Sequence, residues 1–248
     1  MSRSSGETGR AAADSAFYST HWSMVLRAGA DEDASGSAFQ LLYQTYWYPL
    51  YAYVRRRGNA HPDAMDLTQG FFTQLLENRG IAKVHPERGR FRAFLLASLK
   101  NYICNEWRNQ NTQRRGGEWR AISINSTDFE RRFQEQLADH ESPERQFDRN
   151  WVESLLRQVL ERLQADYEQA GRAELYTALH QYLVLNDDRI PQAEIAKQLG
   201  LSIPAVRMSV YRIRKQYGQL LREAIAHTVD SPEDVEDELN KLIGLMRC

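Results

Sequence analysis

Residues 193–221 read AEIAKQLGLSIPAVRMSVYRIRKQYGQLL and form two helix-like segments that are separated at Gly200. In the second segment, apolar residues recur at steps of three and four, which is the spacing of one helix face. They are Val206, Val210, Ile213, Tyr217 and Leu220. Gly200 suits the left-handed position that ends a helix, and Ser202 can cap the next helix by accepting a backbone N–H bond. Two short helices joined by a tight turn that contains glycine predict a helix-turn-helix.

The outward face of the second helix carries basic, small and apolar side chains. If the apolar stripe is buried, the residues left outside are Ser202, Ala205, Arg207, Met208, Ser209, Tyr211 and Arg212. Such side chains at the start of a helix fit the major groove of DNA. We interpret this face as a DNA-reading surface. An ordinary helical hairpin with a solvated basic face is the alternative that the pattern leaves open.

Composition favours a soluble protein over a membrane protein. The chain of 248 residues has a net charge of -1, and 42% of its residues are hydrophobic, which suffices for one or two modest cores. No apolar run approaches the roughly 20 residues that span a bilayer, and the first residues lack the apolar core of a secretory signal. We therefore expect a cytoplasmic protein without membrane insertion, and we expect its N-terminal tail to be disordered.

The residues that usually carry catalysis or bind metals are scattered. The six histidines form no zinc-binding motif, and Cys104 and Cys248 lie far apart. We therefore expect no metal site, no cofactor, no disulfide framework and no enzymatic activity.

The charges are segregated along the chain. Residues 86–120 hold eight Arg or Lys against three Asp or Glu, and residues 205–222 hold five basic residues and no acid. Residues 128–148 hold seven acids against three arginines, and residues 226–248 hold six acids against two bases. Two basic blocks separated by an acidic connector predict two polyanion-binding surfaces on separate modules.

Apolar periodicity predicts helices nearly everywhere and no strand. We predict an all-α protein of two small helical bundles joined by a polar linker, the second bundle ending in the helix-turn-helix. The linker is placed where periodicity is not sustained, next to Ser142-Pro143. The expected parts are a tail with a short helix (1–36), a first bundle (37–112), the linker (113–150), a second bundle (151–223) and an acidic C-terminal extension (224–248).

One helix of the first bundle has a polar face. Asn101, Asn105 and Arg108 recur at steps of four and three, so they line up on one side of that helix. Their side chains can hydrogen-bond base edges and phosphates, and Tyr102 and Trp107 beside them can stack on unpaired bases. A solvated polar face with the aromatic rings in the core is the alternative, and for Tyr102 we favour the core.

Three segments follow one another as the first domain of sigma-70 family factors does. They are LLYQTYWYPLYAYVRRRG (41–58), PDAMDLTQGFFTQLLEN (62–78) and FRAFLLASLKNYICNEWRNQ (91–110). The predicted helix-turn-helix resembles the second domain, so the chain resembles a sigma factor of the extracytoplasmic-function (ECF) type. The resemblance implies a protein that binds core RNA polymerase, recognises -35 and -10 promoter elements and directs transcription initiation. A helix-turn-helix regulator that acts without polymerase is the alternative.

The resemblance also assigns partners. The segment DLTQGFF matches the helix that docks on the β′ clamp helices of polymerase, which gives polymerase contact to Asp66, Gln69 and Phe72. The β flap and promoter DNA are the other implied partners. An anti-sigma factor is conceivable, although nothing in the sequence identifies one.

For DNA, the resemblance assigns the polar face of residues 101–108 to the -10 strand and the outward face of the helix-turn-helix to the -35 element. Arg88 and Arg90, in the extended loop of residues 78–90, join the -10 set. The chain departs from the family pattern at Gly70, where an acidic residue is usual. A mid-helix glycine costs about 1 kcal/mol relative to alanine. The acidic residues 224–248 are an addition to the pattern.

Overall fold

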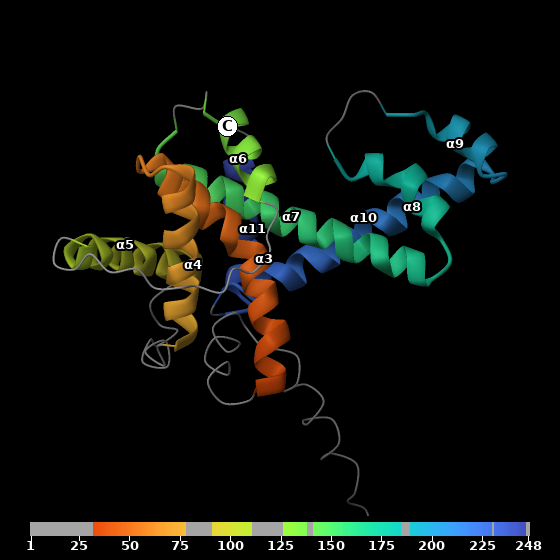
Figure 1. Ribbon diagram of the computed structural model, residues 1–248. Helices are drawn as coiled ribbons and strands as arrows, with labels where there is room; N and C mark the ends of the chain where they lie inside the picture. Colours follow the sequence, from red (N-terminus) through yellow and green to blue (C-terminus); the bar gives the residue numbers. More distant parts are fainter. Residues whose placement is uncertain are drawn as a thin grey trace, which may run out of the picture. The chain divides into compact units, whose positions relative to one another are not determined.

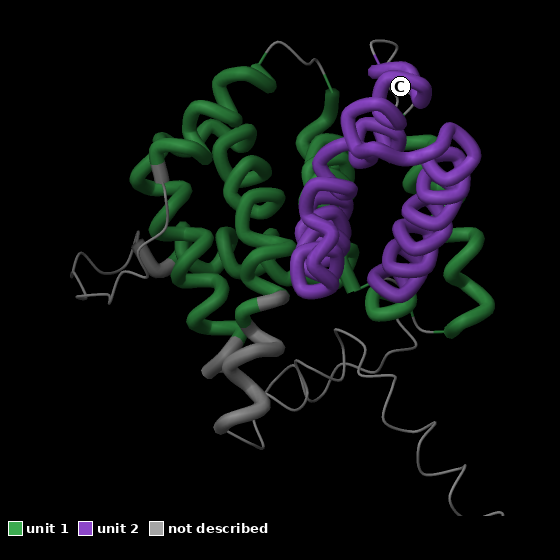
Figure 2. Tube along the Cα trace, turned by 90° about the vertical axis from the view of Figure 1, so that its right-hand side faces the viewer, with its two compact units in different colours: residues 1–154, 226–248 green, residues 155–225 purple. Residues whose placement is uncertain are grey.

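The computed structural model describes residues 32–77, 91–110, 126–137, 141–184, 189–229 and 231–246. Within these ranges the regular secondary structure is helical and contains no strand, which confirms the all-α prediction (Figure 1). The chain divides into two compact units, coloured separately in Figure 2. Unit 1 comprises residues 1–154 and 226–248, and unit 2 comprises residues 155–225. Of the predicted tail with a short helix (1–36), residues 1–31 lie outside the described residues, and residues 32–36 are helical.

Unit 1 is built from helices that surround an aromatic core. They are α3 (Glu32–Arg56), α4 (His61–Glu77), α5 (Phe91–Gln110), α6 (Ser126–Glu135), the first part of α7 (Pro143–Gln169) and α11 (Asp234–Met246). Tyr46 of α3 is fully buried, with its ring centroid 5.6 Å from that of Phe91 and 6.3 Å from that of Trp151. One α3 residue thus contacts both α5 and α7. Large aromatic side chains bury much apolar area each, so this cluster dominates the packing of unit 1.

Helix α4 is buried on two sides. Phe72 packs against Trp47 of α3, with ring centroids 5.6 Å apart, and the neighbouring Phe71 packs against Tyr102 of α5 at 5.9 Å. Adjacent residues of a helix point about 100° apart. Their simultaneous burial therefore places α4 between α3 and α5.

The structure differs from the predicted linker at residues 113–150. Residues 126–135 form α6, and residues from 143 onward begin α7; both segments belong to unit 1 up to residue 154. The periodicity missed α6 because its apolar face consists of only Phe129 and Phe133, one helical turn apart. The predicted acidic extension also folds, since residues 234–246 form α11 in unit 1.

Helix α6 is held to α3 largely by polar contacts around Glu130. The Glu130 carboxylate accepts hydrogen bonds from Nη2 of Arg55 at 2.6 Å and from the hydroxyl of Tyr51 at 2.6 Å. Arg55 also lies over the ring of Phe133, and Arg132 lies 3.8 Å from the ring centroid of Tyr48. Because each charged group has a partner, this network can dock a short helix that buries little apolar surface.

Unit 2 has its own apolar core. The second part of α7 and the long helix α10 (Ile203–Ala226) run through it, together with α8 (Ala173–Leu179), the 3-10 turn His180–Tyr182 and α9 (Gln192–Gln198). Every one of these elements contributes buried side chains to one cluster, among them Leu163, Leu179, Ile195 and Ile213. The buried stripe of α10 is the one that the sequence predicts, with Val206, Val210, Ile213 and Leu220 buried.

Gly70 lies in the middle of α4 because α5 approaches it closely. A Cβ added at this position would overlap the hydroxyl of Tyr102 and lie 3.4 Å from the adjoining ring carbon. Tyr102 is half-buried, and burial together with the charge of Glu106 raises its pKa to about 12. The glycine at this position is therefore explained by helix packing.

Replacing Gly70 by alanine should have effects of opposite sign in two backgrounds. In the parent, Gly70→Ala gains helix propensity but clashes with the Tyr102 hydroxyl, so unit 1 should lose stability. In a Tyr102→Phe background the overlapping atom is gone, and the same change should stabilise by up to about 1 kcal/mol. A double-mutant cycle measured by urea unfolding checks this coupling. Tryptophan fluorescence reports on unit 1 alone, because all five tryptophans precede residue 155. Equal effects of Gly70→Ala in both backgrounds would contradict the proposed contact.

Glu130 should make the stability of unit 1 depend on pH in the acidic range. Burial opposes its ionisation, but hydrogen bonds from Arg55, Tyr51 and Gln134 outweigh burial and lower its pKa from 4.5 to about 2. A carboxyl whose pKa is lowered by folding stabilises the fold above its unfolded pKa and loses that contribution as the pH falls toward the folded pKa. The contribution of Glu130 is thus present at neutral pH and is lost between about pH 4.5 and pH 2.

At neutral pH, Glu130→Gln should destabilise unit 1 by about 1–3 kcal/mol, because Arg55 loses a charged partner. The difference from the parent should shrink as the pH is lowered from 5 to about 2.5. Urea unfolding followed by tryptophan fluorescence measures both quantities. Glu135→Gln, an exposed carboxyl on the same helix, serves as the control and should show neither effect. A Glu130→Gln penalty that is constant over this pH range would exclude the assigned role.

Candidate functional site

The outward face of α10 presents the residues that the sequence assigns to DNA. Met208 is 49% exposed and Tyr211 is 60% exposed, although both are large and apolar or aromatic. Arg207 and Arg212 are exposed beside them, whereas Ala205 is half-buried. Exposed aromatic and apolar side chains next to arginines are typical of surfaces that bind a partner.

The turn before α10 has the geometry expected from its residues. Gly200 has φ +63°, a left-handed conformation that side chains with a Cβ rarely adopt. The Ser202 hydroxyl accepts a hydrogen bond from the backbone N–H of Ala205 at 3.3 Å, which caps the first turn of α10. Ser202 is exposed directly before the start of α10, and its hydroxyl serves as the cap of that helix. The cap and the glycine together fix the direction in which α10 leaves α9.

The basic residues of α10 do not all serve the same purpose. Nε of Arg214 donates a hydrogen bond to the backbone oxygen of Tyr182 at 3.1 Å, and Arg222 donates to the backbone oxygen of Gly218 at 3.2 Å. These two arginines are tied to the fold of unit 2. Arg207 lies one turn from the start of the helix and is exposed, so it is better placed to reach a ligand at that end.

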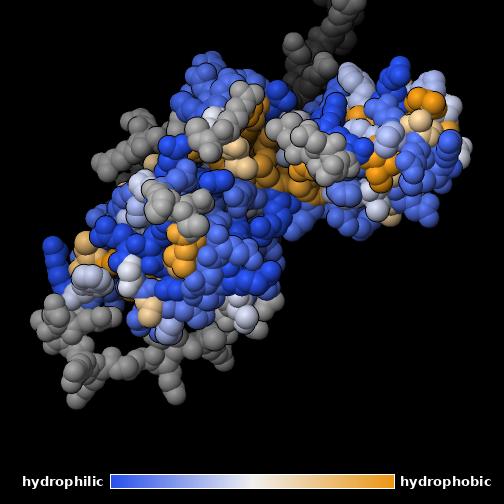
Figure 3. Space-filling view, turned by 90° about the horizontal axis from the view of Figure 1, so that it is seen from above, coloured by the Kyte–Doolittle hydropathy of each residue, from blue (hydrophilic) through white to orange (hydrophobic). Residues whose placement is uncertain are grey.

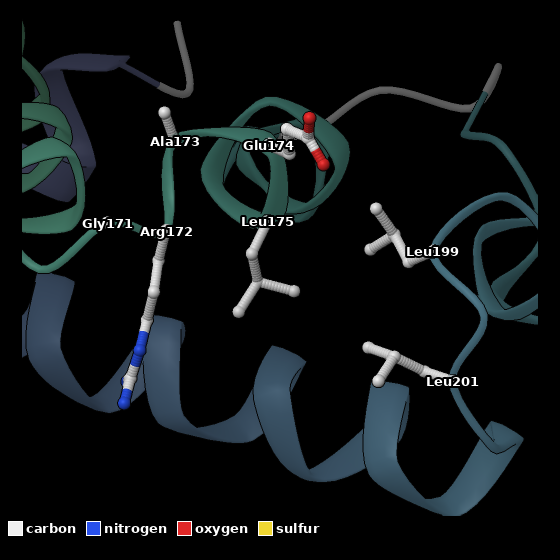
Figure 4. A pocket seen from close by; sticks show the side chains of 7 residues that line it. All are labelled: Gly171, Arg172, Ala173, Glu174, Leu175, Leu199 and Leu201. Carbon is white, nitrogen blue, oxygen red and sulfur yellow. The ribbon is translucent and has the colours of Figure 1, made fainter.

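A pocket that the sequence did not predict is lined by residues of α8 and of the turn before α10. Leu175 of α8 faces Leu199 and Leu201 of the turn before α10 across this pocket, while the side chain of Arg172 extends away from the leucines (Figure 4). Leu201 is 40% exposed. Leu201 has no role among the predictions made from the sequence. The sequence signal that could have indicated this pocket is the apolar residue directly after Gly200, because a turn usually has a polar residue there.

The polar face of α5 is exposed, as its spacing predicts. Asn101 and Asn105 are exposed on α5, and Arg108 follows one turn later. Trp107 is 58% exposed, the second highest value among the large hydrophobic residues of the described chain. Tyr102, by contrast, packs against Phe71, so it belongs to the core as favoured from the sequence. The last turns of α5 thus combine amide, guanidinium and indole groups on one surface.

The predicted polymerase patch on α4 needs one correction. Asp66 is exposed and Gln69 is half-buried, but Phe72 is only 2% exposed. The Phe72 ring is enclosed by Tyr43 and Trp47, with centroids 5.1 Å and 5.6 Å away. Phe72 is therefore a core residue of unit 1 and cannot serve as an exposed apolar anchor. The prediction was wrong because α4 is buried on two sides, where a surface helix would be buried on one.

The remaining predicted DNA contacts, Arg88 and Arg90, lie outside the described residues. In the described ranges no cluster of three or more His, Cys, Asp or Glu side chains could hold a metal ion. No helix of the described chain is long and apolar enough to cross a membrane. On the face drawn in Figure 3, hydrophilic residues predominate, and apolar residues occupy smaller areas.

Comparison with known proteins gives one match. No curated protein and no solved structure matches the chain significantly. Residues 42–113, which include most of α3 together with α4 and α5, match the family model of sigma-70 region 2. The match covers less than half of the chain and shows that residues 42–113 are similar to region 2 of sigma-70 factors.

Proposed function

We propose that the protein is a sigma factor of the ECF type, which binds core RNA polymerase and directs it to promoters with defined -35 and -10 elements. The observation that carries the proposal is the sigma-70 region 2 match in unit 1. The exposed basic start of α10 in unit 2 supports it from a second part of the chain. Unit 1 would act on the -10 element and unit 2 on the -35 element.

Unit 2 would read double-stranded DNA as a helix-turn-helix, with α10 as the recognition helix. A recognition helix enters the major groove and contacts base edges with residues near its N-terminus. Arg207 and Met208 occupy the first two turns of α10, and Tyr211 and Arg212 follow one turn later. Arginine can donate two hydrogen bonds to guanine, and apolar groups can contact the methyl group of thymine. The buried stripe on the other side of α10 would hold this surface in place.

Unit 1 would bind the melted -10 strand along the last turns of α5. Unpaired bases stack on aromatic side chains, and an exposed tryptophan offers the largest stacking surface. Trp107 is exposed between Asn105 and Arg108, which can bond to base edges and phosphates. The buried half of α5, anchored by Phe91, Leu95 and Leu99, would keep this surface rigid.

Core polymerase would contact both units. On α4, Asp66 and Gln69 are the proposed contacts with the β′ clamp helices, and Phe72 supports them from inside the unit. In unit 2, the leucine-lined pocket of Leu175, Leu199 and Leu201 is the proposed site for the β flap, since an apolar hollow suits an apolar anchor from a partner.

A helix-turn-helix regulator that acts without polymerase is the second candidate. The exposed face of α10 alone would suit either protein. The sigma-70 region 2 match favours the sigma factor, because such a regulator has no need of that domain. Affinity capture with purified core polymerase separates the two: a sigma factor should be retained, and a polymerase-independent regulator should pass through.

Reversing the charge of Asp66 should weaken binding to core polymerase without affecting the fold. Asp66 is exposed on α4, so Asp66→Lys should lower core affinity by about tenfold or more through like-charge repulsion or loss of a charged contact. Fluorescence anisotropy with labelled protein measures this. Asp128→Lys makes the same charge change on α6 of the same unit and should bind core like the parent. Equal affinities of the two variants for core polymerase would show that Asp66 is not part of the interface.

Removing both arginines from the start of α10 should abolish recognition of the -35 element. Each bidentate base contact is worth about 1–3 kcal/mol, so Arg207→Ala combined with Arg212→Ala should weaken binding to a cognate -35 duplex by tenfold or more. Binding to core polymerase should be unchanged. Arg162→Ala, which removes an exposed arginine from α7 of the same unit, is the control. If the double variant still starts transcription from a cognate promoter at the parent rate, α10 is not the recognition helix.

A further inference from the structure

The chain leaves unit 1 and returns to it. Residues 1–154 belong to unit 1, residues 155–225 form unit 2, and residues 226–248 are again part of unit 1. Unit 2 is therefore an insertion, and both of its ends are attached to unit 1. The sequence had instead suggested a second domain attached to the first at one end only. Helix α7 carries the chain across the first boundary, and α10 carries it across the second.

The second attachment depends on α11, whose buried face holds it in unit 1. Leu242 is 4% exposed, and Val235, Leu239 and Leu245 are half-buried on the same helix. Thr228 and Val229, which lead into α11, are also buried. The acidic side chains Asp234, Glu236 and Asp237 are exposed in the first turn of α11. The helix is thus amphipathic and is packed through one face.

Glu238 is the exception among these acids because its side chain is 1% exposed. Its carboxylate forms an ion pair with Nη1 of Arg92, at the start of α5. The same guanidinium donates from Nε to Asp148 of α7 at 2.9 Å and lies 4.6 Å from the ring centroid of Trp151. We call this group the Arg92 node: Arg92, Asp148, Trp151 and Glu238. It joins α5, α7 and α11 in the interior of unit 1.

A buried ion pair of this kind constrains geometry more than it adds stability. Forming it requires the desolvation of two charges, and its replacement by apolar residues is often neutral. Removing only one partner is costly, because the other charge stays buried without compensation. Glu238 therefore makes the docking of α11 specific: an α11 that slid by one residue would leave Arg92 without that partner.

We propose that α11 is an intramolecular latch, which docks at the Arg92 node and holds the far end of unit 2 to unit 1. With the latch docked, unit 2 is tethered at residues 154 and 226. With the latch released, α7 is the one remaining structured connection of unit 2 to unit 1, and the distance between the two units varies over a wider range. The latch thus sets how freely the two proposed DNA-binding units move with respect to each other, and it does so whether or not polymerase is the partner.

The first part of the test breaks the second tether without removing the latch. A recognition sequence for a specific protease is inserted between Val229 and Ser231 in the full chain, so that cleavage separates α10 from α11. Spin labels replace exposed Gln44 of unit 1 and exposed Thr177 of unit 2, with both native cysteines changed to serine. The distribution of label distances is measured before and after cleavage, and size-exclusion chromatography shows whether the α11 fragment stays bound.

We expect the cut protein to retain the fragment and to give a broader distance distribution than the uncut protein. Loss of the fragment from the cut parent, or an unchanged distribution after cleavage, would overturn the proposal. This part needs no substitution at the node, so it does not depend on a variant that folds poorly. It also involves neither DNA nor polymerase, so its outcome is independent of the proposed function.

The second part tests the node with a matched pair of variants. Glu238→Ala should weaken retention of the cut fragment by about 100-fold or more. Asp237→Ala, the exposed neighbour on the same helix, should retain it like the parent. Tryptophan fluorescence monitors the fold of unit 1 in both variants. If Glu238→Ala retains the fragment as well as Asp237→Ala does, the Arg92 node is not what holds the latch.

Discussion

The guanidinium of Arg92 is the constraint on which unit 1 depends. It is buried at the start of α5, stacks on Trp151 and bonds to carboxylates from two other helices. A buried cation must have its partners in place, so α7 and α11 are placed together with α5. The aromatic core then fills the space between them, with Tyr46 of α3 in contact with Phe91 and Trp151. One charge therefore determines which helices can complete the unit.

The two units differ in how their helices are held. Unit 2 is organised by a continuous apolar cluster to which each of its elements contributes. Unit 1 adds polar networks to its aromatic core, at the Arg92 node and at Glu130. Apolar packing tolerates small shifts, whereas charged networks require defined positions and are sensitive to pH. Acid should therefore loosen unit 1, through Glu130, before it affects the core of unit 2.

The parts that the sequence predicted are those governed by local periodicity. The buried stripe of α10 and the polar face of α5 follow from residues within one helix, such as Val206 and Val210 or Asn101 and Asn105. The parts that it missed depend on pairs far apart in the chain. Arg55 and Glu130 are 75 residues apart, and Arg92 and Glu238 are 146 residues apart. No periodicity connects such pairs, so α6 was read as linker and α11 as an extension. Phe72 was misplaced for a related reason, since its burial depends on Tyr43 and Trp47, which belong to another helix, α3.

The inserted position of unit 2 has a consequence for synthesis on the ribosome. Residues 155–225 leave the ribosome before α11 does, although α11 belongs to the unit that began first. Domains fold as units during translation, generally from the N-terminal side. Here all residues of unit 2 are synthesised before unit 1 is complete, because Glu238, the buried partner of Arg92, is translated later. The nascent chain thus exposes an unfinished unit 1 for as long as unit 2 and α11 take to be translated, and in that interval chaperones would find their target in the first half of the protein.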